Sequence, residues 1–522
     1  MDYKKYISYY INASRAKGDM AEKLRKYDDY WEGRVNRAES ENDPGSNTNI
    51  VHPNVEGQVA ALIEQNIAVT PVPVTPQDVE FAETVRIILE FIMDKNRLIR
   101  KLDIHERRRE KYGTGIFRVT FDPAALGGQG MPIIDNVSPQ ALYIDPCITD
   151  PYRLSEAEFI IERIKKSVYW AREHFGSDVA EKIKPNFDPA ADSPDDEIFP
   201  EGDSDWYIHL LVWTNRGGRL RLVEMTGCGI VLSDSGEGFY KTAKYPYFIT
   251  PLYFRENSVW GKGDAELLIP LQDLINDLDD QIRINARLTG NPQRLIETGS
   301  GIDLDALTNE AGLNIPVNNI NTVKNLEAPP LPSYIENRRD SAMRYETQRV
   351  TRFSDQAAGG GKQSGVSTAT EAMAIQQAGT AAASHKKIVL QETLSEVFSY
   401  CLMLVKQFWT REMAFRVTDK KDEFIFFKPS YLAEIHGEEE SEGFDIVVTV
   451  GAGMPKNKAF VYKLMTELCT GGIISRAEAR KYLVQQFGLP LAPQMPEDIQ
   501  GEVKARTAMN PEIEGAKDVN KE

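Results

Sequence analysis

Two long helical segments that enclose a short insert constrain this sequence more than any other feature. Over Asp264–Leu288, apolar residues recur at helical spacing on one face: Leu267, Leu271, Leu274, Leu278 and Ile282. A second helix is predicted over Ser333–Phe353, and the insert between the two ends at the proline cluster Pro329–Pro332. Because the insert joins two helices, we expect it to protrude from them. A glycine-rich loop, Ala357–Ser367, leads into a helix of about 40 residues, Ala369–Trp409, which is about 60 Å long at 1.5 Å per residue.

The rest of the chain mixes helices and strands. Helical spacing of apolar residues predicts helices at residues 1–40, 55–68, 78–112 and 168–175. Apolar runs bounded by prolines and glycines predict strands at residues 115–123, 132–139, 141–146, 157–167, 206–215, 219–227, 245–254 and 444–450, with Gly217-Gly218 as a hairpin turn. Pro185–Asp205 is acidic and contains no lysine or arginine, so we expect an exposed, mobile loop. The pattern indicates a mainly helical α+β fold.

Length and composition indicate a globular protein that is cytoplasmic when made. Its 522 residues are enough for about three or four domains. The apolar share of 41% and the charged share of 27% are those of a soluble protein. The best candidate for a membrane span, Gly57–Val74, is interrupted by polar residues and falls short of the roughly 18–20 apolar residues that a span needs. The N-terminus has no signal-peptide core.

The residues that carry chemistry form no site that the sequence reveals. Four separated cysteines predict buried thiols in a reducing compartment: Cys147, Cys228, Cys401 and Cys469. Six histidines include no HExxH motif and no pair at metal-binding spacing. Gly359–Lys362 resembles part of a phosphate-binding loop, but glutamines replace the glycine at 356 and the serine or threonine at 363. We therefore expect no catalytic residue, no metal and no cofactor.

Six blocks of sequence, in a fixed order, carry a family resemblance. They are SNTNIVHPNVEGQVAALIEQNIAVTPVPVTP, GTGIFRVTFDP, NVSPQALYIDPCITD, YFRENSVWGKGDAELLIPLQDLINDLDDQI, SGVSTATEA, and FDIVVTVGAGMPKNKA with a following GGIIS. Each block alone is loosely defined, whereas their order is specific. Over residues 40–490 this order resembles the portal proteins of tailed bacteriophages, which form the ring through which DNA enters and leaves the capsid.

The resemblance implies an architecture and a set of partners. It implies a ring of twelve subunits at one capsid vertex of the virion, assembled in the host cytoplasm, with no membrane contact. The large terminase would dock on the clip, head-completion and tail adaptor proteins would replace it, and the major capsid protein, scaffolding protein and translocating double-stranded DNA would be further partners. The implied parts are residues 1–262, N-terminal region and wing; 263–289, first stem helix; 290–332, clip; 333–354, second stem helix; 355–368, channel loop; 369–455, long kinked helix and return to the wing; 456–490, C-terminal helical crown; and 491–522, polar tail.

Candidate channel residues follow from the resemblance. Lys362 is the only basic residue of the loop and follows three glycines, Gly359, Gly360 and Gly361, so it is a candidate for brief phosphate contacts; otherwise it is a solvated lysine. One stripe of the first stem helix carries acids that would repel DNA from a channel wall: Asp273, Asp277 and Asp280. The alternative is an ordinary solvated face, or ion pairs between helices or subunits. The candidates for such pairs are Asp279 with Arg283, and Asp340 with Arg344.

Net charge separates the possible functions. A net charge of −17 argues against a protein that holds DNA tightly, because such proteins neutralise phosphates with basic residues. The same net charge suits a protein that lets DNA slide past. One alternative is a non-viral structural ring adaptor with similar helices. Another is a DNA-binding regulator that uses the helix pair predicted at Ala459–Phe487, although the second of these helices is only weakly basic.

Overall fold

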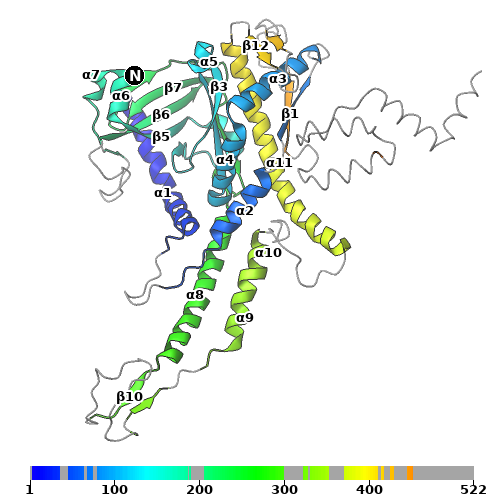
Figure 1. Ribbon diagram of the computed structural model, residues 1–522. Coiled ribbons are helices and arrows are strands. Elements are labelled where there is room, and N and C mark those ends of the chain that lie inside the picture. The colour runs from blue at the N-terminus through cyan, green and yellow to red at the C-terminus, as the bar shows by residue number, and fades with distance from the viewer. Residues whose placement is uncertain are drawn as a thin grey trace, which may run out of the picture. The chain divides into compact units, whose positions relative to one another are not determined.

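The computed structural model describes residues 3–35, 45–63, 67–73, 79–185, 187–189, 205–298, 321, 323–326, 330–351, 369–409, 413–416, 424–427, 444–450 and 469. The chain divides into two compact units, residues 1–63 with 68–449 and residues 64–67 with 450–522. The first unit carries the helices and the larger sheets of Figure 1.

An antiparallel sheet of five strands forms the larger β region. Its order is β4 (Leu142–Ile144), β5 (Phe159–Ser167), β6 (Trp206–Arg216), β7 (Arg219–Thr226) and β8 (Val231–Asp234). The predicted hairpin joins β6 to β7, and φ is 59° at Gly217 and 78° at Gly218, as a two-residue type I′ turn requires. Helix α1 (Lys4–Glu32) packs on this sheet and buries Tyr10 against apolar residues of β5 and β6.

A second antiparallel sheet has the order β3 (Met131–Asn136), β2 (Thr114–Asp122) and β9 (Tyr247–Pro251). Short helices connect the strands of the two sheets: α5 (Ala125–Gly128), η1 (Pro151–Glu156), α6 (Val168–Phe175) and α7 (Ser177–Ala180). The long helix α11 (Ala369–Phe408) packs against all three strands of the second sheet. The mixture of helices with small sheets confirms the predicted α+β class in its broad form.

Several helices begin or end where the sequence pattern did not predict. Helix α1 ends at Gly33, whose φ of 73° is left-handed, and not at residue 40. Helix α2 (Val51–Ile63) starts earlier than predicted, because the side chain of Asn49 accepts a hydrogen bond from the N–H of His52 at 3.0 Å. The helix predicted over residues 78–112 is two helices, α3 (Val79–Lys95) and α4 (Leu98–Tyr112), with φ of 50° at Arg97. Buried Asn96 explains this break, since its amide bonds a carbonyl and an N–H of β3 at 3.0 and 2.9 Å.

The two predicted long helices lie side by side (Figure 1). Helix α8 (Asp264–Gly290) leads to the antiparallel pair β10 (Arg294–Ile296) and β11 (Val323–Asn325). The chain then returns along α8 as three pieces, α9 (Ser333–Ser341), a π-helical turn η3 (Ala342–Glu346) and α10 (Thr347–Thr351). These segments follow one another without a break, so the predicted second helix is confirmed as far as Thr351, with a π-helical turn inside it. Residues 352 and 353, where it was predicted to end, lie outside the described part of the chain.

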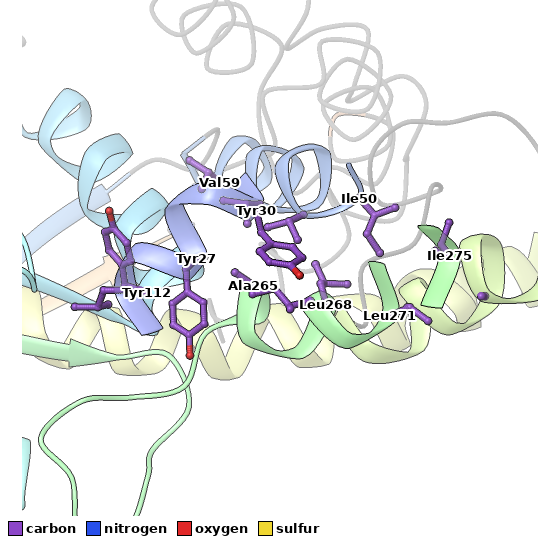
Figure 2. Packing of buried hydrophobic residues seen from close by; sticks show 14 residues of the cluster. Tyr27, Tyr30, Ile50, Val59, Tyr112, Ala265, Leu268, Leu271 and Ile275 are labelled. Carbon is purple, nitrogen blue, oxygen red and sulfur yellow. The ribbon is translucent and has the colours of Figure 1, made fainter. Parts of the chain in front are cut away.

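The first three turns of α8, Asp264–Ile275, form what we call the α8 root. Figure 2 shows apolar residues of the root packed against tyrosines of α1 and α4 and aliphatic side chains of α2 and the segment before it. The cluster includes Tyr27, Tyr30, Ile50, Val59, Tyr112, Ala265, Leu268, Leu271 and Ile275. The α8 root therefore belongs to a core that is built from segments far apart in the sequence.

The predicted apolar face of α8 is partly wrong. Leu271 and Leu278 are buried, whereas the other three predicted members, Leu267, Leu274 and Ile282, are only half-buried. The face that is most fully buried instead includes Leu268 and Ile275 together with two polar residues, Gln272 and Asn276. A search for apolar periodicity passes over these two positions because their side chains are polar.

One stretch of α11 also corrects the sequence analysis. By length and composition alone, His385–Phe408 is long and apolar enough to cross a membrane, contrary to the expectation that no segment is. Half of this stretch is buried inside the protein, and Leu390, Leu394 and Phe398 are completely enclosed. Such burial is what the core helix of a soluble protein also shows.

The remaining described strands form two small sheets. β12 (Met413–Arg416) pairs with β13 (Phe424–Phe427), and β1 (Ile67–Pro73) pairs with β14 (Phe444–Val450). β14 confirms the strand predicted at residues 444–450.

Two predictions about burial are wrong at particular residues. Cys401 is a buried thiol as predicted, but Cys147 is exposed and Cys228 and Cys469 are half-buried. Asp188 lies in the stretch predicted to be an exposed acidic loop, yet its side chain is 2% exposed and accepts a hydrogen bond from Arg163 at 3.1 Å. Most of that stretch, residues 190–204, lies outside the described part of the chain.

Candidate functional site

The predicted channel loop is not among the described residues. Lys362, Gly359, Gly360 and Gly361 all lie outside them, as does nearly all of the predicted crown. The described part of the channel prediction is therefore α8 and its neighbours, and several buried polar contacts meet at the α8 root.

The predicted acidic stripe of α8 makes contacts within the chain. Asp273 accepts a hydrogen bond from the hydroxyl of Tyr30 at 2.6 Å. Asp280 accepts one from the N–H of Ser46 at 2.6 Å and another from Arg283 at 2.9 Å, and these bonds lower the pKa of Asp280 against the effect of its partial burial. Asp277 is exposed. Two of the three acids therefore face segments of the same subunit, and a DNA-facing role for the stripe stays a prediction.

Polar side chains on one face of α8 hold the segment before α2, a contact that the sequence pattern did not predict. Side chains four residues apart on α8 bind alternate backbone N–H groups of the segment 45–51: Gln272 binds that of Ile50 at 3.1 Å, Asn276 that of Thr48 at 2.7 Å, and Asp280 that of Ser46. Four helical residues rise about 6 Å and two extended residues span about 6.6 Å, so the two spacings match. The Asn-rich segment before α2 therefore runs along α8 and antiparallel to it.

The predicted ion pairs have different partners in the described structure. Asp279 contacts Arg339 of α9 at 2.8 Å, which links the two long helices. Arg283 contacts Asp280 on its own helix. Asp340 contacts Arg339 at 3.3 Å, and Arg344 is exposed. Pairs between subunits stay a prediction.

Three glycines let the α8 root approach the end of α4. Gly113 has φ of +81°, and a Cβ there would lie 2.6 Å from the backbone nitrogen of Gly263. A Cβ on Gly263 would in turn lie 2.7 Å from the carbonyl oxygen of Glu110. Gly261 donates its N–H to the hydroxyl of Thr114 at 2.9 Å. Backbone therefore packs directly on backbone, which explains the Gly-Lys-Gly sequence immediately before α8.

A buried ionic cluster joins the same place to α11. The ammonium of Lys386 lies 2.9 Å from a carboxylate oxygen of Asp264, the first residue of α8, and 2.9 and 3.0 Å from the two oxygens of Glu110 at the end of α4. It also donates to Gln58 of α2, whose amide donates to Asp264 at 2.7 Å. All four side chains are buried. We call Gln58, Glu110, Asp264 and Lys386 the Lys386 cluster.

The charged groups of the Lys386 cluster shift one another's pKa values. Burial lowers the pKa of Lys386, but the carboxylates of Glu110 and Asp264 outweigh it and raise that pKa above its ordinary value. Burial raises the pKa of Glu110 to about 8; Lys386 opposes this rise and Asp264 adds to it. Both directions agree with one cation shared by two carboxyl groups, so Lys386 stays charged and one of the carboxyl groups takes up a proton first.

A second group of buried polar side chains lies one turn earlier on α4. Glu106 contacts Arg109 at 2.7 Å and Nδ1 of His105 at 2.8 Å. Burial opposes ionisation of Glu106, but Arg109 and His105 lower its pKa, whereas burial lowers the pKa of His105. Arg109 also donates to the backbone carbonyl of Lys386 at 2.7 Å. Helices α4 and α11 are therefore held by two adjacent polar contacts.

The geometry indicates a site that holds helices together. In the part of the chain that the structure describes, no group of three or more His, Cys, Asp or Glu side chains is arranged to hold a metal ion. Gln272 and Asp264 of the α8 root bind backbone N–H groups, Gln58 and Lys386, and the common effect of these bonds is to fix α2, α8 and α11 together.

A comparison with protein families identifies the chain. The family model described as phage SU10 portal protein matches residues 127–468, which is well over half of the sequence. No curated protein matches the chain. The match spans α8, the β10–β11 insert, α9 and α11, but it begins after the blocks at residues 46–76 and 113–123, where the resemblance rests on the sequence alone. The chain therefore belongs to the family of the phage SU10 portal protein, a family of structural, non-enzymatic portal proteins of tailed bacteriophages.

Proposed function

We propose that copies of this chain form a closed ring at one vertex of the capsid and that double-stranded DNA passes through its centre during packaging and ejection. The observation that carries the proposal is the helix pair α8 and α9–α10, joined at one end by the β10–β11 insert within the region that matches the portal family. The resemblance gives twelve subunits, and assembly takes place in the host cytoplasm. Family membership favours this function over a non-viral ring adaptor, and the helices that a DNA-binding regulator needs lie outside the described residues.

The partners follow from the parts of the ring. In this proposal α8 and α9–α10 are the two stem helices, and residues 290–332 are the clip on which the large terminase docks and is later replaced by head-completion and tail adaptor proteins. The wing contacts the major capsid and scaffolding proteins. Exposed apolar side chains support a docking role for the described ends of the clip, since Leu295 is 56% exposed and Leu326 48% exposed.

Weak contact with DNA completes the proposal. Strong phosphate contacts would halt translocation, and the net charge of −17 keeps such contacts few. We assign brief phosphate contact to Lys362 in its glycine loop. Among the three acids of the stripe, we assign the channel-facing position to Asp277, whose side chain is exposed.

Deletion of the clip tests the docking role. We expect a variant in which a short glycine-serine linker replaces residues 291–331 to lose binding of the large terminase, while its thermal unfolding stays close to that of the full chain, because the core of the α8 root is untouched. A matched control deletes the acidic residues 190–204 and is expected to keep terminase binding. Normal terminase binding by the clip deletion would refute the assignment.

A further inference from the structure

The Lys386 cluster is placed where four elements of the fold converge. Gln58 comes from α2, Glu110 from the last turn of α4, Asp264 from the first residue of α8, and Lys386 from α11. Their side chains are 9%, 2%, 0% and 6% exposed, so water cannot replace the contacts between them. The end of α4 and the start of α8, which the glycine contact brings close, are therefore also tied to one ammonium group.

The cluster contains one negative charge more than its cation balances. The groups that face Lys386 are the carboxyls of Glu110 and Asp264, the amide of Gln58 and the ring of Tyr253, whose centroid lies 5.7 Å from the ammonium. Arg109 on the neighbouring turn of α4 is engaged with Glu106 at 2.7 Å. Two buried carboxylates that share one cation cannot both ionise without cost. Glu110 is the group that takes up the proton, because its burial and the neighbouring Asp264 carboxyl raise its pKa.

We propose that Lys386 is a positioning residue that makes α4, the α8 root and α11 move as one body, and that a proton on the carboxyl of Glu110 controls how firmly they are joined. The contacts required are those of the described chain: three hydrogen bonds to carboxylate oxygens at 2.9–3.0 Å and the bond to Gln58. This joint between the helices lies within one chain, so it does not depend on ring formation. Its meaning for the DNA channel, as a link between the stem and the long helix that follows the channel loop, rests on the proposed function.

The direction of the pH effect follows from the pKa of Glu110, which is raised from 4.5 to about 8 in the folded protein. A raised pKa stabilises the folded form fully below the unfolded value and loses that contribution as the pH rises through the folded value. The joint is therefore firmest below about pH 4.5, loosens as the pH rises from there to about 8, and changes little above that. The pKa of Lys386 is also raised, so its ammonium stays charged across this window.

Hydrogen exchange of the purified full chain tests the joint. Lys386→Met leaves two buried carboxyls without their cation. Removing one partner of a buried ion pair lowers protein stability strongly. We expect peptides from the end of α4 and from the α8 root to exchange at least about tenfold faster, together with the peptide that contains the substitution. Lys387→Met, one position along the same helix, is the matched control and is expected to leave the α4 and α8 peptides unchanged. Faster exchange confined to α11 in Lys386→Met would overturn the proposal.

A milder variant covers the possibility that Lys386→Met does not fold. Glu110→Gln keeps an oxygen that can accept from Lys386 but cannot ionise. After correction for chemical exchange, we expect protection of the α8 root to fall between pH 5 and pH 9 in the natural chain and to stay flat in Glu110→Gln. A purely structural role for Glu110 would leave the pH profile unchanged, and that result would refute the proton-linked joint. Native mass measurement of the same samples shows whether they form rings, so failure of the ring proposal is recorded separately.

Discussion

Single glycines decide how closely the main helices of this protein approach. Gly113 ends α4 in a left-handed conformation, and its backbone lies directly against Gly263 at the start of α8. The N–H of Leu252 in the neighbouring strand region binds the carbonyl of Gly113 at 2.9 Å, so this backbone is held from a third side. Such a position has no room for any side chain.

Gly113→Ala should therefore be strongly destabilising. The left-handed conformation costs alanine about 1–2 kcal/mol, and the clash with Gly263 adds about 1–3 kcal/mol, for a total of about 2–5 kcal/mol. Gly127→Ala is the control, because Gly127 has φ of +68° but open space around its missing Cβ, so only the backbone cost of about 1–2 kcal/mol applies. Thermal unfolding of both variants checks the difference. Equal losses in the two would show that the close approach at Gly113 contributes nothing.

At this scale the sequence predicted little of the site. Lys386 has no signature in the sequence, because its carboxylate partners lie 276 and 122 residues away and a lysine in a helix is ordinarily solvated. The acids of α8 were recognised as a stripe, but their partners, Tyr30 and Ser46, come from the first fifty residues. Pairings between distant segments need the fold, and the fold was not available from periodicity.

Elements were predicted better than residues. Strands β2, β5, β6, β7 and β9 follow the apolar runs closely, because buried strands bounded by glycine and proline leave a clear local pattern. The errors lie where a tertiary contact overrides local preference. Asn96 interrupts a continuous helical pattern to bind β3, and the second long helix contains a π-helical turn at Ala342–Glu346 next to the α8 root.

The contact between α8 and the segment 45–51 gives a prediction at this scale. Gln272→Ala removes the acceptor for the N–H groups of Ile50 and Val51, and an unsatisfied buried donor costs about 1–3 kcal/mol. Gln281→Ala, on the same helix but exposed, should change stability by less than about 0.5 kcal/mol. Thermal unfolding compares the two, and hydrogen exchange at Ile50 and Val51 locates the effect. Unchanged exchange there in Gln272→Ala would show that this contact does not hold the segment.

For the whole molecule, the order of elements proved more informative than any motif. The family match from residue 127 to residue 468 confirms the portal resemblance, although none of its sequence blocks is diagnostic alone. The reason is physical: a ring-forming structural protein has no catalytic residues to hold constant, so its identity is carried by how helices and an insert follow one another. The subunit number, the channel lining and the docking partners depend on contacts between chains, and these stay predictions.

The closed ring is the central claim, and native mass spectrometry of the purified full-length chain, with electron-microscope images of the same sample, tests it most directly. The account predicts one dominant species whose mass is a whole-number multiple of the chain mass, twelvefold by the family resemblance, and images of a ring with an open centre. Monomers alone at micromolar concentration, or compact particles without a central opening, would contradict it.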